Sequence, residues 1–398
     1  MKKKFLFSKL ALLAMFAFSS CGEENDYLTT TSFENDSEVL PIDDAVVQEA
    51  IMFVSSLDDG ATRSASAYSV KTIQKMNLST EGDTRVDNPL VVPDFYSIGL
   101  NDEMGTVLLA EKGNTIKPLA YFQGENNLDI NEVLEDTTST LSFIVKVLVE
   151  QNLDMEESDV ESDTRAVTNT IVERLEPKCK VYWHQGAPFN KYCFTDNGAQ
   201  AVAGCVAIAG VQALTVLQPS EPLISSWDAV IAEKYYSYSN TEVTKEVARL
   251  IAEIGAKIHM DYGETASGAQ KSDLIKHFKN KYGVVDYDCE RAIDVLKTEH
   301  GVIIIGGYAT KTTKKKFFKK TTTYSDGHAF IADGYVKYGD EGKKNDDPYY
   351  LHINYGWGNN SYNGYILSAK KKYTEDAAMK FSYEITYATL TYPSEKNW

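Results

Sequence analysis

The chain has 398 residues, a length that allows two domains and a short additional segment. Its hydrophobic and charged fractions, 43% and 24%, are those of an ordinary globular protein and exclude wholesale disorder, collagen and coiled coils. Because 57 Asp and Glu outnumber 40 Lys and Arg, the formal net charge is -17, and a phosphate backbone would repel most of the molecule. Nucleic-acid binding is therefore not expected.

The N-terminus has the pattern of an export signal. Three lysines at positions 2–4 precede an apolar run over residues 6–18 that is too short to cross a bilayer. The FSSC sequence that ends in Cys21 resembles the lipobox of bacterial lipoproteins, in which the cysteine becomes the lipidated first residue. We expect a lipoprotein signal peptide over residues 1–20, lipidation at Cys21 and secretion across the inner membrane. The alternative is a plain cleavable signal with an incidental cysteine.

Residues 21–43 are expected to form an acidic tether. The EEND sequence at 23–26 looks like the signal that sends some Gram-negative lipoproteins to the cell surface, whereas the simpler interpretation is a solvated spacer. The first interpretation predicts an outer-membrane lipoprotein at the cell surface, attached to the membrane through its N-terminal lipid only.

Residues 44–153 predict a small α+β domain. An acidic start and the helical spacing of apolar residues favour an amphipathic helix over 43–57, and a second helix is predicted over 141–149. Between the helices, runs bounded by Gly, Asp and Asn predict short strands at 68–73, 95–100, 106–110 and 118–122. This unit has about the minimum size that can bury a core of its own.

A change in composition separates this unit from the rest of the chain. Residues 154–170 are polar, acidic and without periodicity, which indicates an exposed linker. Arg165 lies within it, and Arg174 and Lys178 follow closely. Since proteolytic nicking concentrates in such segments, we assign residues 154–178 to a cleavable linker and residues 179–398 to a second domain.

The second domain also has an α+β pattern. Residues 205–217 are apolar nearly all round, which predicts a helix buried at the centre of the domain. Further helices are predicted at 242–254 and 271–279, followed by strands at 302–305, 329–335, 349–354 and 365–367. Helices first and strands later favour α+β over a doubly wound sheet. We interpret the lysine-rich residues 311–320 as a solvated hairpin or loop rather than an anion site.

Four cysteines follow Cys21 in a compartment that permits disulfides. Cys179 and Cys193 are the more local candidate pair, and their pairing stays open. No CxxC or CxxC…HxxxH spacing occurs in the sequence, so a structural zinc site is not expected.

Cys205 is a candidate nucleophile because it opens the predicted central helix. The oriented backbone N–H groups at a helix N-terminus stabilise a thiolate and lower the pKa of the thiol. The alternative is a small buried cysteine that starts a core helix. A thiolate needs a base, and His328 is the best candidate because it lies at the start of the predicted strand 329–335. Its alternative is a structural histidine.

Two further segments complete a catalytic pattern. Asn354 follows the strand 349–354, and its side-chain carbonyl could accept the Nδ1–H of the histidine while Trp357 screens that bond from water. The order Cys, His, Asn-Trp is that of papain-type cysteine peptidases. Upstream, the amide of Gln185 could pair with the backbone N–H of Cys205 to form an oxyanion hole.

Several ordered blocks of the sequence are similar to the streptopain family of secreted cysteine peptidases. The resemblance extends over about residues 44–390, including an N-terminal unit that resembles the inhibitory propeptide of the family. The blocks are QGxPFN from Gln185, GCVA around Cys205, GHAF around His328 with DGY at 333–335, and HxNxGWG at 352–358. The segments DYG at 261–263 and SGA at 267–269 look like the substrate-side loop of the family.

The resemblance implies a papain-like fold and a zymogen that is activated by cutting the linker. It also implies endopeptidase action on proteins, a preference for a hydrophobic residue two positions from the scissile bond, and no metal or organic cofactor. The partners would be protein or peptide substrates and the chain's own propeptide at residues 44–153. The implied catalytic residues are Cys205, His328, Asn354, Trp357 and Gln185, and the implied substrate-binding residues are Gly327, Ser267 and Gly268.

Two departures and one alternative remain. Tyr355 stands where relatives of the family usually have a first Trp, which predicts looser cover over the histidine. The interval from Gln185 to Cys205 and the segment 309–325 differ in length from those of relatives, which leaves the shape of the cleft and the subsite preference open. The alternative function is a catalytically inactive surface adhesin or binding lipoprotein on a papain-like scaffold, since a fold does not guarantee activity. Labelling of Cys205 by a thiol-directed peptide inhibitor distinguishes the two.

Overall fold

The computed structural model describes most of the two predicted domains. The described residues are 44–57, 68–76, 93–101, 104–124, 133, 145, 148–149, 152–153, 155, 169–233, 241–316, 319–339, 348–358, 362–368 and 383–395. The predicted signal peptide, Cys21 and the acidic tether lie outside them. None of the helices in this part of the chain is long and apolar enough to cross a membrane.

The N-terminal unit is one helix on a four-stranded antiparallel meander. Helix α1 (Asp44–Leu57) packs on strands β3 and β4 through Val46, Ala50, Phe53 and Val54, whose i, i+4, i+7, i+8 spacing places them on one face. The meander consists of β1 (Val70–Met76), β2 (Asp94–Leu100), β3 (Thr106–Lys112) and β4 (Thr115–Phe122). The predicted helix at 43–57 and all four predicted strands are thus confirmed. Of the predicted helix 141–149, the described residues 145, 148 and 149 are helical.

The helical half of the second domain is built around α4 (Cys205–Leu217). All of residues 206–217 are buried, as the apolar sequence of this helix predicts. Around it lie α5 (Trp227–Ala232), α6 (Glu242–Lys257) and α7 (Lys271–Tyr282), while α8 (Ala292–Lys297) contacts strands. The hydroxyls of Ser226 and Thr241 accept backbone N–H groups at the start of α5 and α6 and thereby end the preceding loops.

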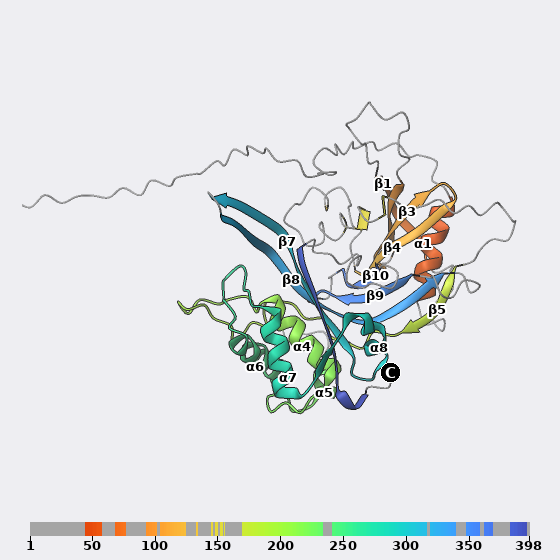
Figure 1. The fold of residues 1–398 in the computed structure, drawn as a ribbon. Helices are drawn as coiled ribbons and strands as arrows, with labels where there is room; N and C mark the ends of the chain where they lie inside the picture. The colour runs from red at the N-terminus through yellow and green to blue at the C-terminus, as the bar shows by residue number, and fades with distance from the viewer. Residues whose placement is uncertain are drawn as a thin grey trace, which may run out of the picture.

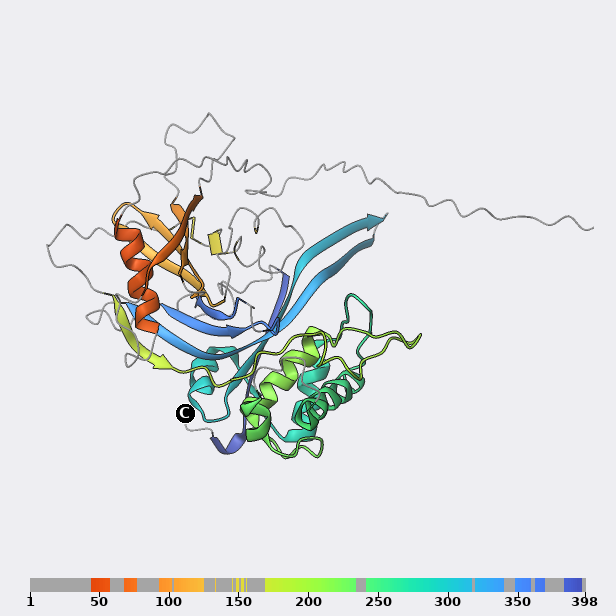
Figure 2. The same ribbon diagram turned by 180° about the vertical axis from the view of Figure 1, so that it is seen from behind.

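The strands of both domains join in one sheet. The later strands are β6 (Val285–Tyr287), β7 (Val302–Lys316), β8 (Lys319–Gly339), β9 (Tyr349–Asn354), β10 (Gly364–Ser368) and β11 (Tyr383–Thr391). Among the described residues, the order is β1-β2-β3-β4-β10-β9-β8-β7-β11-β6. The junction is the antiparallel pair β4–β10, in which Phe122 lies opposite Gly364. Figures 1 and 2 show the N-terminal unit and the helical half on opposite sides of β8 and β9.

Alternation along the central strands explains this two-sided arrangement. Ile304 and Ile331 belong to the core around α4, whereas Ile305 and Phe330 belong to the core shared with the N-terminal unit. Because successive side chains of a strand point to opposite faces, β7 and β8 bury residues on both sides. The N-terminal unit therefore covers one apolar face of the sheet.

One predicted boundary differs from the structure, and the predicted hairpin is present. Strand β5 (Thr170–Leu175) pairs with β8 from Thr170↔Gly339 to Leu175↔Tyr335, so the last part of the range assigned to a linker is a strand. The predicted hairpin or loop at 311–320 is the outer part of the long β7–β8 ribbon, which projects from the body in Figures 1 and 2. Cys179 and Cys193 are both buried and free, so they are not bridged.

Candidate active site

Cys205 is the first residue of α4 and is half-buried. The preceding Gly204 has φ 86°, a conformation that residues with a Cβ rarely adopt. A Cβ at this position would also lie 2.7 Å from the Sδ and Cε atoms of Met260. Glycine at 204 therefore permits the sharp entry into α4 that places the thiol at the end of the helix.

His328 lies on β8 opposite Gly307 of β7, and only 7% of its surface is exposed. Its Nε2 lies 2.9 Å from the backbone oxygen of Tyr355. Since a carbonyl oxygen only accepts, this contact requires a proton on Nε2 and leaves Nδ1 of the neutral ring as an acceptor. The ring lies between Trp357, with centroids 5.1 Å apart, and Phe330, at 5.9 Å.

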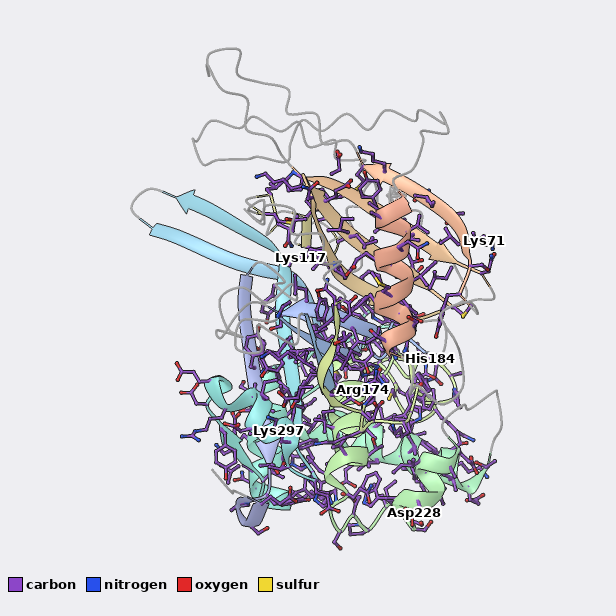
Figure 3. The ribbon with its side chains drawn as sticks, turned by 90° about the vertical axis from the view of Figure 1, so that its right-hand side faces the viewer. Lys71, Lys117, Arg174, His184, Asp228 and Lys297 are labelled. Carbon is purple, nitrogen blue, oxygen red and sulfur yellow. The ribbon has the colours of Figure 1, made fainter. Side chains whose placement is uncertain are left out.

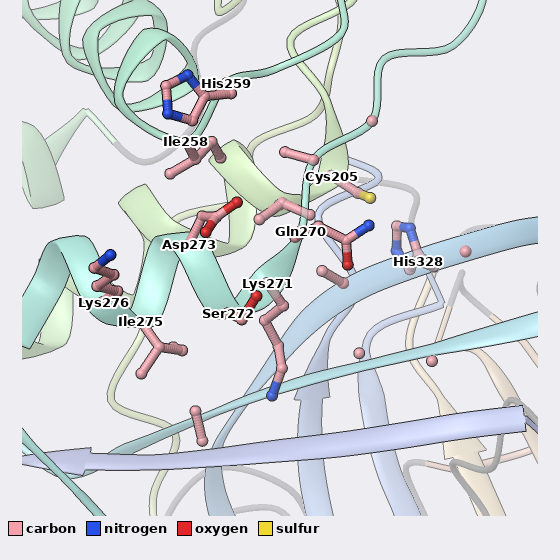
Figure 4. A pocket seen from close by; sticks show the side chains of 18 of the residues that line it. Cys205, Ile258, His259, Gln270, Lys271, Ser272, Asp273, Ile275, Lys276 and His328 are labelled. Atoms are coloured by element: carbon pink, nitrogen blue, oxygen red, sulfur yellow. The ribbon is translucent and has the colours of Figure 1, made fainter.

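Cys205 and His328 line the same cavity, which has a volume of about 1330 Å³. Figure 4 shows the sulfur of Cys205 directed toward the imidazole of His328. A backbone hydrogen bond links this sulfur to Ala329, the residue after the histidine. Residues 123 positions apart in the sequence are thereby neighbours at one surface, as the sequence predicts.

Burial disfavours the charged form of both groups. Desolvation raises the pKa of the Cys205 thiol and outweighs the backbone hydrogen bonds at Ala329, Val206 and Cys205 itself. Desolvation also lowers the pKa of His328 to about 4, although the bond to Tyr355 acts in the opposite direction. The backbone N–H groups at the helix N-terminus thus lower the thiol pKa as predicted, but burial is the larger effect and the net pKa is raised.

Asn354 does not orient the imidazole. Its Oδ1 accepts from Nε2 of Gln212 at 2.9 Å and from the backbone N–H of Gly356 at 3.1 Å, and its Nδ2 donates to the oxygen of Val181 at 2.9 Å. The predicted bond from Asn354 to the histidine is wrong. The neighbouring backbone carbonyl of Tyr355 supplies the acceptor, which a sequence pattern does not reveal because every residue carries a carbonyl.

The Tyr355–Trp357 segment covers the histidine. The indole of Trp357 lies against the His328 ring, as predicted, and stacks on Tyr355 with centroids 4.5 Å apart and an interplanar angle of 11°. Tyr355 is fully buried, and its backbone N–H donates to Oδ1 of Asn363 at 2.9 Å. This buried stack and hydrogen bond fix the carbonyl that holds Nε2 of the histidine.

Gln185 lies near the nucleophile through its backbone. Its carbonyl accepts from the N–H of Ala203 at 2.8 Å, two residues before Cys205, but Gln185 is not among the described residues that line the cavity. Its oxyanion role stays a prediction. Gln270, which the sequence analysis missed, does line the cavity, and in Figure 4 its amide points toward Cys205 and His328.

The three predicted substrate-binding residues all line the cavity: Gly327, Ser267 and Gly268. The hydroxyl of Ser267 donates to the oxygen of Val202 at 2.7 Å and accepts from Gly263 N at 3.1 Å. Gly268 exchanges two backbone hydrogen bonds with Asp261, at 2.8 and 3.0 Å. The loop that contains Ser267 and Gly268 is thus held to the segment that precedes α4, and both residues line the cavity.

The chain is similar to one known protein family and to solved structures of cysteine proteases. Residues 220–366, a range that includes His328, Asn354 and Trp357 and begins after Cys205, match the model of the Peptidase C10 family. A prointerpain A fragment from Prevotella intermedia is 17% identical, with 77% of this chain and 96% of that chain covered and a TM-score of 0.46. Active interpain A cysteine protease from the same organism is 21% identical, with coverages of 56% and 96% and a TM-score of 0.36. No curated protein matches the chain. Residues 220–366 of this chain are thus similar to the Peptidase C10 (streptopain) family of cysteine proteases.

Proposed function

We propose that this chain is a lipid-anchored surface endopeptidase that is made as a zymogen and cuts proteins through Cys205 and His328. The observation that carries the catalytic part is the shared cavity of the half-buried thiol and of an imidazole whose Nε2 is bonded to a backbone carbonyl. That bond leaves Nδ1 available to accept the thiol proton.

The reaction follows from this neutral pair. Nδ1 of His328 takes the thiol proton as Sγ of Cys205 attacks the peptide carbonyl, and the Tyr355 carbonyl stabilises the imidazolium through Nε2–H. The imidazolium then gives its proton to the leaving amine as the C–N bond breaks. Water hydrolyses the resulting thioester with His328 as the base. The Cys205 backbone N–H, together with Gln185, would hold the oxyanion.

The contacts of the N-terminal unit support its role as a propeptide. Its β4 continues the sheet of the peptidase domain, and the hydroxyl of Tyr350 donates to the Pro118 oxygen at 2.8 Å. The hydroxyl of Tyr338 donates to the buried carboxylate of Glu49 at 3.0 Å. Arg174, labelled in Figure 3, donates from its guanidinium to the backbone oxygen at the end of α1. The described residues of this unit line no part of the Cys205–His328 cavity, and most of residues 125–151 lies outside the described residues.

Casein digestion by the full-length chain tests the catalytic proposal. We expect the wild type to shorten itself and to digest casein, while Cys205→Ala yields an intact precursor without activity. Cys193→Ala is the matched control because Cys193 is buried away from the cavity. Self-processing by the Cys205→Ala chain, with no other protease present, would contradict the assignment. Inactivity of the wild type together with an unlabelled Cys205 would favour the binding lipoprotein instead.

Lipid labelling tests the proposed location, which rests on the sequence around Cys21. Metabolic incorporation of a palmitate analogue is expected in the wild type and not in Cys21→Ala. Digestion of the chain by protease added to intact cells would support surface exposure, and protection from that protease would contradict it.

A further inference from the structure

The cavity continues well beyond the catalytic pair. From Cys205 and His328 it extends along the first turns of α7 to the strands β6, β7 and β11, where Lys271, Ile275, Asp286, Gly306 and Tyr387 line it. The whole cavity, about 1330 Å³, is large enough for side chains of a bound peptide. Its chemistry therefore bears on which substrates the enzyme selects.

Lys271 is the first residue of α7, and its side chain lies across the wall of this extension. A Cβ built on Gly306 would lie 3.3 Å from the Cδ of Lys271, so the lysine stem packs over a glycine of β7. Figure 4 shows the ammonium directed down to the strands. Among the described residues, its hydrogen bond is a long one of 3.4 Å to the oxygen of Ile304. Because an ammonium has three N–H donors, this ion is largely unsatisfied by the protein.

The strand register gives the distance from the reacting atoms. Gly307 of β7 lies opposite His328, and Ile304 lies three residues further along the strand. At 3.3–3.4 Å per residue, the ammonium is about 10 Å along β7 from the level of the histidine. The side chain of a residue one or two positions from the scissile bond of an extended peptide has this reach.

Asp286 does not neutralise the lysine. The charge of Asp286 raises the pKa of Lys271, but no contact within ion-pair distance joins the two side chains. The Asp286 carboxylate instead accepts from the backbone N–H of Thr389 at 2.9 Å. Desolvation lowers the pKa of Lys271 to about 8 and raises that of Asp286, whereas a close ion pair would shift both in the opposite directions. Asp286 lies on β6, two strands beyond β7, and is therefore further from His328 than Lys271 is.

We propose that Lys271 gives the peptidase a subsite for an acidic side chain, so that it cuts proteins near Asp or Glu. This deepens the proposed function and rests on it. A carboxylate that enters the cavity from the catalytic pair meets the ammonium before it meets Asp286, and supplies the acceptors that the protein does not.

A peptide library tests the inference, with each of the positions beside the scissile bond varied in turn. The full-length chains are wild type, Lys271→Met, Lys271→Glu and the control Lys257→Met, which changes an exposed lysine at the end of α6 outside the cavity. Active sites are counted by titration with a thiol-directed inhibitor. We expect the wild type and the control to prefer Asp or Glu over Leu at one position by about 10- to 100-fold in kcat/KM.

The variants should change this preference without abolishing cleavage. Lys271→Met should cut Leu-containing peptides and lose the acidic preference, and Lys271→Glu should favour Lys or Arg at that position. A wild type that prefers hydrophobic residues, or an acidic preference that survives in Lys271→Met, would overturn the subsite while leaving the peptidase assignment intact. Failure of the wild type to cut any peptide or to react with the inhibitor would overturn the proposed function, and the subsite with it.

Discussion

Asn363 connects the N-terminal unit to His328, the proposed catalytic base. Its backbone oxygen accepts from the N–H of Gln123, just after β4, at 2.7 Å, and its Oδ1 accepts from the N–H of Tyr355 at 2.9 Å. The Tyr355 carbonyl in turn lies 2.9 Å from Nε2 of His328. Asn363 is only 3% exposed, so water could not replace its Oδ1 as the acceptor for the N–H of Tyr355 if the side chain were removed. We expect it to act as a positioning residue.

The substitution Asn363→Ala leaves a buried Tyr355 N–H without its acceptor, which costs about 1–3 kcal/mol of unfolding free energy. The same change loosens the carbonyl that holds the imidazole, so we expect kcat to fall by about tenfold while KM changes little. Steady-state kinetics on a fluorogenic peptide and denaturant unfolding measure the two effects.

A control and a rescue separate positioning from general damage to the fold. Ser368→Ala removes a buried hydroxyl at the end of β10, the strand that begins directly after Asn363. This hydroxyl has no hydrogen-bond partner among the described residues, so kcat should be unchanged. Asn363→Asp keeps an acceptor for Tyr355 and should recover most of kcat. A loss of stability in Asn363→Ala with unchanged kcat would refute the positioning argument.

Four further outcomes are expected. The kcat/KM of the wild type should stay level through neutral pH and fall as the pH drops through about 4, because the pKa of His328 is lowered to about 4. A fall in kcat/KM with a midpoint near pH 6.5 would contradict this. For the same reason the unfolding free energy should decrease as pH falls from 6.5 to about 4, since the unfolded chain then binds a proton that the folded chain does not. Gly204→Ala should lower kcat/KM at least tenfold, because the positive φ of Gly204 strains any residue with a Cβ and because that Cβ would clash with Met260. Gly198→Ala is the control, since Gly198 also has a positive φ but no atom lies within 4 Å of its Cβ position. N-terminal sequencing of the mature enzyme should place the cut before β5, because β5 pairs with β8 and the ammonium of Lys178, just after β5, bonds to three backbone oxygens at and after the end of α8. A mature chain that begins after Lys178 would contradict this.

The pattern of apolar residues predicted the helices and strands whose own side chains are buried in the core. The helix at 205–217 and the strand at 349–354 agree with the structure because their side chains are buried along the whole length. Strand β5 was not predicted, because its polar sequence is half-buried and is held mainly by pairing with β8. The outer β7–β8 ribbon likewise lacks apolar alternation, since its backbone pairs without covering a core.

The same distinction applies to the site. Cys205 and His328 could be predicted because their chemistry depends on residue type and their sequence contexts indicate a helix start and a strand, although His328 lies within the long strand β8 and not at its start. The Tyr355 carbonyl could not, because a backbone acceptor leaves no mark in the sequence. Lys271 and Gln270 were missed because their importance depends on which strands face the start of α7; their position directly after the SGA segment at 267–269 is the signal that was available.

The most direct test of the catalytic pair is the rate at which iodoacetamide alkylates Cys205 at pH 7 in the wild type and in His328→Ala. If the imidazole accepts the thiol proton, the wild-type rate should exceed that of the variant by about 10² or more, with Cys205 as the modified residue. Equal rates in the two proteins, with both shown to be folded, would contradict the account.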